Sequence, residues 1–138
     1  FERFAGVRAW LDRAVAEARA KGYAETLFGR RRYIPELKDK NFNIRAFGER
    51  TATNSPLQGS AADLIKIAMI RIHERLAERG LGAKLLLQVH DELLFSLPSA
   101  QVADAIEELS GIMENVCAFV PLKVDAHWSG QSWFHAKS

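Results

Sequence analysis

Two apolar runs of strand length, separated by only three residues, constrain the fold of this chain more than any other feature. The runs cover residues 85–89 and 93–97, and His90-Asp91-Glu92 lies between them. A connection this short joins neighbouring antiparallel strands, so the pattern predicts a β-hairpin with a charged tip. Because both strands are rich in Leu and Val, we expect much of the hairpin surface to be buried.

The N-terminal part of the chain predicts a helix followed by a second hairpin. Apolar residues at i, i+3 and i+4 spacing indicate an amphipathic helix over residues 4–20, ended by Gly22. Two short β-prone runs, 23–28 and 31–34, surround a glycine and predict a hairpin whose tip carries three arginines.

The middle of the chain predicts two helices separated by a proline. The first covers about 44–54 and is interrupted at Pro56, because proline lacks a backbone donor and disfavours helix at the preceding residue. The second runs over 60–79, and Ser60 with Asp63 resembles a capping box at its start. Its apolar residues cover more than one stripe, so we expect burial on two sides.

Beyond the charged hairpin, a helix is expected over about 100–118 and a last strand over 120–126. Helices beside antiparallel hairpins define an α+β fold, with the hairpins packed against long helices.

Composition excludes several classes of protein. The chain has 138 residues, of which 48% are hydrophobic and 26% charged, so it is neither a disordered tail, a coiled coil nor collagen-like. It has no apolar run of membrane-spanning length, so we expect no membrane partner. Its single cysteine, Cys117, favours a reducing compartment. Because the chain begins at Phe1 without an initiator Met, we expect a fragment or a processed product.

Charge is unevenly distributed along the chain. Residues 1–50 contain 12 Lys and Arg against 7 Asp and Glu, whereas residues 51–138 contain 7 against 10. This split is compatible with an anionic polymer on the first part and a cation on the second.

The adjacent carboxylates Asp91 and Glu92 are the first candidate site. Close carboxylates repel each other unless a cation or a basic group offsets their charge. Mg²⁺ binds one or two carboxylates and keeps places for water and substrate phosphates. The alternative is a solvated turn, because Asp is a common turn residue.

A set of polar residues before the long helix is the second candidate site: Arg45, Arg50, Asn54 and Gln58. The last three are spaced four apart and therefore share one helical face as far as the break at Pro56 allows. Arg contacts phosphates, and Asn and Gln offer donors and acceptors to base edges in the minor groove, where all base pairs look alike. The alternative is a polar face in water. The Arg30-Arg31-Arg32 tip is likewise either a phosphate contact or a solvated turn.

Three segments together resemble the family A DNA polymerases. They are residues 22–35 (GYAETLFGRRRYIP), 49–63 (ERTATNSPLQGSAAD) and 88–93 (QVHDEL), in this order and spacing. The resemblance covers essentially the whole chain. It implies that 1–138 is a single piece, the C-terminal part of a polymerase domain, with 1–22 a helix at the base of the fingers and 23–138 part of the palm.

The resemblance also implies a reaction and its residues. The reaction is attack of a primer 3′-hydroxyl on a nucleotide α-phosphate, assisted by two Mg²⁺ ions, with primer–template DNA and deoxynucleoside triphosphates as partners in the complete enzyme. Asp91 would bind the metal, Glu92 would be an accessory carboxylate, and His90 would lie near the primer terminus. The expected primer–template contacts are Arg50, Asn54, Gln58 and, on the backbone, Arg45.

Some parts of the family pattern are missing. The other catalytic aspartate and the nucleotide-binding fingers helix would precede Phe1, so the metal site is incomplete and we expect the chain alone not to polymerise. The segment 127–133 (HWSGQSW) is about one residue longer than the usual ending. The resemblance further implies a bacterial cytoplasmic location at the nucleoid. Core exposed by the missing segments is a candidate surface for oligomerisation.

Two other functions stay open. One is a non-catalytic DNA-binding module or the small subunit of a split polymerase. The other is a metal-dependent nuclease, which ranks last because it needs three or more clustered carboxylates. The charged hairpin offers only Asp91 and Glu92 close together, and Asp63 and Asp125 are distant in sequence.

Overall fold

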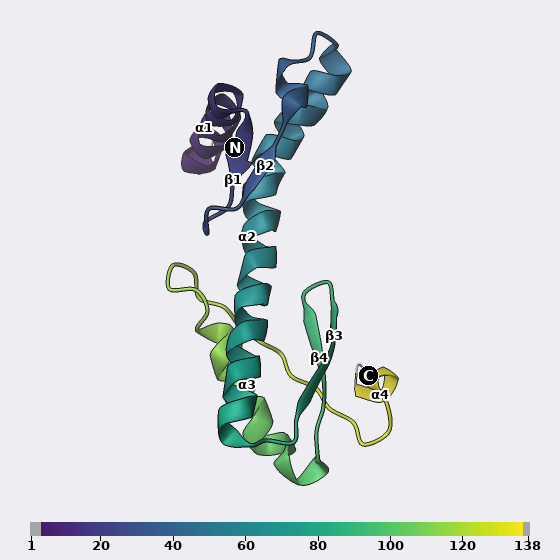
Figure 1. Ribbon diagram of the computed structural model, residues 1–138. Helices are drawn as coiled ribbons and strands as arrows, with labels where there is room; N and C mark the ends of the chain where they lie inside the picture. Colours follow the sequence, from purple (N-terminus) through teal and green to yellow (C-terminus); the bar gives the residue numbers. More distant parts are fainter. Residues whose placement is uncertain (1–3, 137–138) are drawn as a thin grey trace. The chain divides into compact units, whose positions relative to one another are not determined.

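The computed structural model describes residues 4–136 and confirms the α+β class (Figure 1). The chain divides into two compact units, Phe1–Asp63 and Leu64–Ser138. Each unit holds one antiparallel two-stranded sheet, β1–β2 in the first and β3–β4 in the second.

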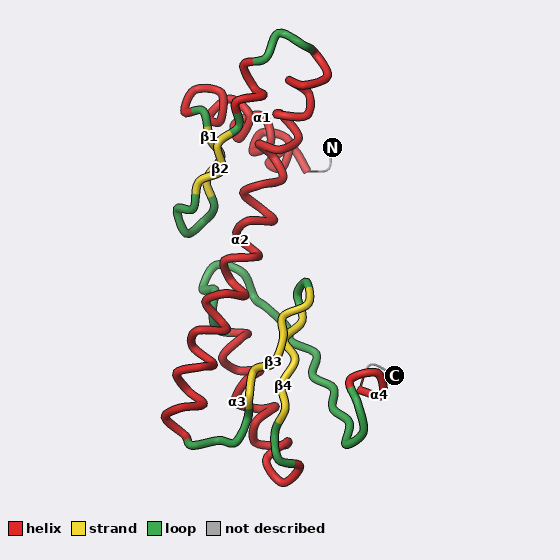
Figure 2. Tube along the Cα trace, turned by 45° about the vertical axis from the view of Figure 1, so that its right-hand side comes forward, coloured by secondary structure: helices red, strands yellow, loops and turns green. Residues whose placement is uncertain are grey.

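The first unit confirms the predicted helix and hairpin. Helix α1 (Ala5–Lys21) ends at Gly22, whose φ of 85° is the left-handed conformation that glycine adopts most readily. Strands β1 (Tyr23–Glu25) and β2 (Arg31–Tyr33) pair in antiparallel register beside α1 (Figure 2). A short 3₁₀ helix, Pro35–Lys38, follows them. Five residues form the core of this unit: Ala18, Ala24, Ile34, Leu37 and Ala52.

Helix α2 (Phe42–Arg79) is continuous over 38 residues, so the predicted interruption at Pro56 is wrong. Proline removes only its own N–H, which would have bonded the carbonyl of Ala52, and the remaining helical bonds persist on either side. Pro56 lies in the part of α2 that belongs to the first unit, and packing of this part against the rest of that unit offsets the local loss, because tertiary contacts dominate helical stability.

The predicted capping box is also wrong. Ser60 and Asp63 lie inside α2, where a cap has no unpaired N–H to satisfy. Their side chains instead bond the connection between β1 and β2: Ser60 Oγ accepts the N–H of Leu27 at 2.9 Å, and Asp63 accepts from Thr26 and Arg30. A Ser-x-x-Asp pattern cannot distinguish these two uses without knowledge of what packs against the helix.

The second unit contains the hairpin that the apolar runs predicted. Strand β3 (Lys84–Val89) pairs with β4 (Glu92–Ser96), with a bulge between Leu85 and Leu87. The hairpin packs against a core shared with α2 and α3 (Val102–Glu114) (Figure 1). That core consists of Ile72, Leu76, Ala83, Ala105 and Leu109, with Leu93, Phe95 and Leu97 against it.

Elements of the second unit are buried on one face only. The sequence instead predicted a largely buried hairpin and a long helix buried on two sides, and both predictions are wrong. No residue of β3 or β4 is buried, and Leu86 and Leu87 are 57% and 48% exposed. On α2, Ile72 and Leu76 are buried while Ile70 is 59% exposed. The core that these elements share lies on one face of each of them, and the opposite face stays exposed to water.

The end of the chain is less regular than predicted. The helix expected over 100–118 is a 3₁₀ turn, Ser99–Gln101, followed by α3, which ends at Glu114. Asn115 is the C-cap, and its side-chain amide donates to the carbonyl of Gly111 at 2.7 Å. The strand expected over 120–126 does not form, since within residues 4–136 no strand pairs with it. A short helix, α4 (Trp133–Ala136), closes the described part.

None of the helices within residues 4–136 combines the length and the apolar character needed to cross a membrane.

Candidate functional site

The tip of the β3–β4 hairpin is a two-residue turn formed by His90 and Asp91. Val89 pairs with Glu92, so Glu92 is already the first residue of β4. His90 has a φ of 53°, the only positive value among the non-glycine residues described. Two-residue hairpin turns need positive φ at the first position and usually place glycine or asparagine there. Histidine is one of the few non-glycine residues that adopt this conformation, at some cost in backbone strain.

Asp91 presents an unengaged carboxylate at this tip. Its side chain is exposed and makes no hydrogen bond or ion pair with any residue in the range 4–136. Glu92 is exposed as well, but it is a strand residue next to Leu93, which packs on the core. Since neighbouring strand residues point to opposite faces, Glu92 lies on the face away from that core. The two carboxylates therefore have different surroundings.

The carboxylates at the tip are the type of ligand that Mg²⁺ binds, but there are too few of them to complete its coordination. Carboxylate oxygens are the ligands that this ion prefers, and it needs near-octahedral coordination. Across residues 4–136, no group of three or more His, Cys, Asp or Glu side chains is placed to hold a metal. The carboxylates at this tip therefore do not complete a metal site within residues 4–136.

Three of the four predicted DNA contacts share an exposed face of α2. Arg50, Asn54 and Gln58 follow one another at steps of about 40° around the helix axis. Their side chains are exposed and make no hydrogen bond or ion pair within the described part of the chain. We call these three residues the polar face of α2. Its guanidinium and amide groups are free to contact phosphates and base edges.

Arg45, the fourth predicted contact, lies on the other side of α2. Its guanidinium donates a 3.2 Å hydrogen bond to the carbonyl of Asp39 and lies 5.8 Å from the ring centre of Phe42. Arg45 is half-buried, so its charge is engaged within the first unit.

The three arginines near the β1–β2 tip have separate environments. Arg30 donates from Nε to Asp63 at 2.7 Å. Arg31 lies 4.7 Å from the ring centre of Tyr23 and 3.8 Å from Glu25. Arg32 is exposed and has no such partner among the described residues. Of the three, Arg32 is the cation available to a phosphate.

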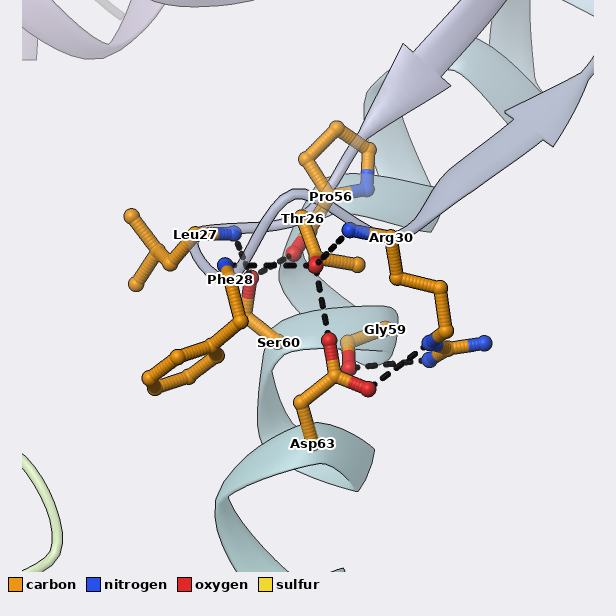
Figure 3. A network of polar contacts seen from close by, with 8 residues as sticks. All are labelled: Thr26, Leu27, Phe28, Arg30, Pro56, Gly59, Ser60 and Asp63. Atoms are coloured by element: carbon orange, nitrogen blue, oxygen red, sulfur yellow. Dashed lines mark hydrogen bonds and ion pairs between the residues drawn. The ribbon is translucent and has the colours of Figure 1, made fainter. Parts of the chain in front are cut away.

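A polar network joins this tip to α2, and sequence reasoning missed it (Figure 3). Thr26 and Arg30 reach Asp63, and the Arg30 guanidinium also donates to the carbonyl of Gly59 at 3.1 Å. Ser60 Oγ donates to the carbonyl of Pro56 at 2.5 Å. The four α2 positions have i, i+3, i+4 and i+7 spacing, which is the pattern that could have revealed a stripe facing one partner.

A charged cluster on the second unit is structural in character. Arg75 donates to Glu108 of α3 at 2.5 Å and contacts Glu78 at 3.3 Å, and Arg79 lies 3.5 Å from Glu108. The hydrogen bond to Glu108, then that to Glu78, raises the pKa of Arg75 above its ordinary value. These ion pairs connect α2 to α3 and leave Arg75 permanently charged.

Comparison with known proteins defines the class of this chain. The model of DNA polymerase family A matches residues 1–135, so the chain belongs to this family. It is 54% identical over 137 residues to DNA polymerase I of Bacillus subtilis (strain 168) and 49% identical over 138 residues to DNA polymerase I of Geobacillus stearothermophilus. Each match covers 99% of the chain but 16% of the relative, so the chain spans about a sixth of their length.

A solved structure agrees with these relatives. The fold is similar to that of the POL domain of Pol1 from M. smegmatis in complex with DNA primer-template and dNTP. The TM-score is 0.87 and the sequence identity 45%, over 91% of this chain and 22% of the other.

Proposed function

We propose that this chain is the C-terminal part of a DNA-directed DNA polymerase, in which it supplies Asp91 as a Mg²⁺ ligand and the polar face of α2 as a primer–template contact. The reaction is the transfer of a nucleotide from a deoxynucleoside triphosphate to a primer 3′-hydroxyl. Family membership supports this assignment, as does the similarity to a polymerase domain whose structure holds DNA primer-template and dNTP.

The observation that carries the proposal is the unengaged carboxylate of Asp91 at the tip of β3–β4. A carboxylate with an internal partner would serve the fold, whereas Asp91 has none among the described residues. The turn that presents it is held in a conformation that costs free energy at His90. Both features favour a ligand from outside the described residues.

The roles at this tip follow from position. Asp91 would hold Mg²⁺, which when bound polarises the attacking hydroxyl and stabilises the leaving phosphates. Glu92, on the face of β4 that points away from the core, would be an accessory carboxylate near the site. His90 would place its imidazole near the primer terminus, where both ring nitrogens can form hydrogen bonds.

The polar face of α2 would hold the duplex. Arg50 would contact a phosphate, and Asn54 and Gln58 would contact minor-groove edges. Purine N3 and pyrimidine O2 acceptors occupy nearly the same place in every base pair, so amide donors there accept any correct pair. This readout is independent of sequence, as template copying requires.

We place residues 1–22 at the base of the fingers and 23–138 in the palm. Because the described residues offer too few ligands for two ions, the isolated chain is expected to be inactive. Function in the bacterial cytoplasm is part of the same proposal.

Primer extension with a recessed 3′ end, Mg²⁺ and four nucleotides tests this function. The chain is assayed alone and then mixed with the remaining part of B. subtilis DNA polymerase I. Extension only in the mixture, abolished by Asp91→Ala, is the expected result.

The second candidate is a DNA-binding module without catalysis. Within residues 4–136 no three His, Cys, Asp or Glu side chains are placed to hold a metal together, which is compatible with this candidate. DNA binding that falls with salt, together with no extension in the mixture, would support this candidate and refute the first.

A further inference from the structure

Helix α2 is interrupted in its hydrogen bonding at the centre of its polar face. Arg50 and Asn54 precede Pro56, and Gln58 follows it. Proline leaves the carbonyl of Ala52 without its helical donor, and helices bend most easily at such a position. A bend there would rotate Gln58 away from the other two residues.

The β1–β2 hairpin contacts α2 on both sides of this proline. Before it, Ala52 of α2 is fully buried in the same cluster as Ala24 of β1. After it, the tip bonds Gly59, Ser60 and Asp63 through Arg30, Leu27 and Thr26 (Figure 3).

Gly59 allows the closest part of this contact. A Cβ at this position would lie 2.6 Å from Thr26 Cγ2, so any larger residue would push the tip away from the helix. The contact is therefore made against the backbone of α2 itself.

The contacted stripe and the polar face lie on opposite sides of α2. At 100° per residue, Ala52, Pro56, Ser60 and Asp63 cluster about one direction, and Arg50, Asn54 and Gln58 cluster about the opposite one. The hairpin consequently contacts α2 on the side opposite to the polar face and leaves the polar face uncovered.

We propose that the β1–β2 hairpin holds α2 straight across Pro56, and we call this support the splint. Thr26 and Asp63 are its positioning residues. By keeping α2 straight, they hold Arg50, Asn54 and Gln58 on one face for DNA. The functional half of this inference rests on the proposed DNA contact of the polar face. Thr26 is the centre of the splint, because its one hydroxyl donates to Asp63 and accepts the N–H groups of Phe28 and Arg30.

Distances between spin labels test the splint without DNA. Labels are attached at Phe47→Cys and Ala61→Cys in a Cys117→Ser chain; both sites are exposed and about 21 Å apart along the helix. We expect a narrow distance distribution in the parent and in Thr26→Ser, and a broad one in the isosteric Thr26→Val.

Adding Pro56→Ala to Thr26→Val restores the lost helical bond and should narrow the distribution again. A narrow distribution in folded Thr26→Val overturns the splint. If circular dichroism shows that Thr26→Val is unfolded, Asp63→Asn takes its place, with the same outcomes.

The affinity for a primer–template duplex, measured by fluorescence anisotropy, tests the functional half. Thr26→Val should bind about fivefold more weakly, the value of one hydrogen bond, and both Thr26→Ser and Thr26→Val/Pro56→Ala should recover. A broad distribution with unchanged affinity keeps the splint and refutes the DNA face. A narrow distribution with weakened binding refutes the splint and indicates that the tip itself contacts DNA.

Discussion

The hydroxyl of Thr26 donates a 2.7 Å hydrogen bond to Asp63 Oδ2, across 37 positions of sequence. The Thr26 methyl group lies on the backbone of α2 at Gly59, and Asp63 is only 8% exposed. One side chain thus joins the turn of the first hairpin to the helix by a polar bond and by close packing. The packing contact leads to a prediction about stability.

Gly59→Ala is expected to lower the free energy of unfolding by about 1–3 kcal/mol, because the new methyl overlaps Thr26 Cγ2. Thr26→Ser removes that Cγ2 and keeps the hydroxyl, so Gly59→Ala should cost much less in the Thr26→Ser background. Urea denaturation of the four proteins measures the coupling. Gly111→Ala is the matched control, since nothing lies within 4 Å of its new Cβ and alanine favours the helix. Equal costs in both backgrounds would contradict the packing.

Local patterns predicted most elements of the fold. The end of α1 at Gly22 and both hairpins follow from glycine, turn length and apolar alternation, which act over a few residues. The continuity of α2 could not be predicted in this way. Pro56 favours an interruption locally, and the contacts that outweigh it come from residues about 30 positions away.

The candidate site likewise has one part that local sequence patterns predict and another that depends on contacts they do not reveal. Regular spacing predicts that Arg50 and Asn54 share a face, whereas Gln58 joins them only because α2 is continuous through Pro56. The different environment of Arg45 depends on Asp39 and Phe42, which no helical spacing reveals. Likewise, the missing strand over 120–126 depends on whether a pairing partner exists, and a strand pattern carries no information on that point.

His90→Gly is expected to raise the free energy of unfolding by about 0.5–1 kcal/mol, because glycine adopts a φ of 53° without steric cost. The same change should weaken binding to primer–template DNA, since the imidazole is lost. Thermal melting and anisotropy measure the two effects. A loss of stability would show that the turn does not strain His90, and unchanged binding would remove His90 from the interface.

Arg45→Ala and Gln58→Ala are expected to separate stability from binding. Gln58 has no partner in the described part of the chain, so its loss should leave stability within about 0.5 kcal/mol and weaken DNA binding about tenfold. Arg45→Ala removes the bond to Asp39 and should cost about 1 kcal/mol of stability, with a smaller effect on DNA. The reverse pattern would favour Arg45 over Gln58 as the DNA contact.

Glu108→Gln should lower the melting temperature of the chain, because it removes the strongest partner of Arg75. Arg75 has a raised pKa in the folded state, so its contribution is complete below its unfolded pKa and is lost only as the pH rises through the still higher folded value. The decrease in melting temperature should therefore be equal at pH 7 and pH 9, and smaller in 1 M salt. A decrease that salt leaves unchanged would indicate lost packing.

The central claim is that Asp91 is a metal ligand of a polymerase. The most direct measurement replaces the 137 matching residues of B. subtilis DNA polymerase I with this chain and follows single-nucleotide incorporation in Mg²⁺. The unsubstituted chimera should extend the primer, and Asp91→Asn should slow extension by more than about 100-fold, the loss that follows when even an outer partner of a metal ligand is disturbed. Asp104→Asn, an exposed carboxylate on α3, is the control and should be unaffected. An inactive unsubstituted chimera, or an Asp91→Asn chimera as fast as the unsubstituted one, would contradict the account.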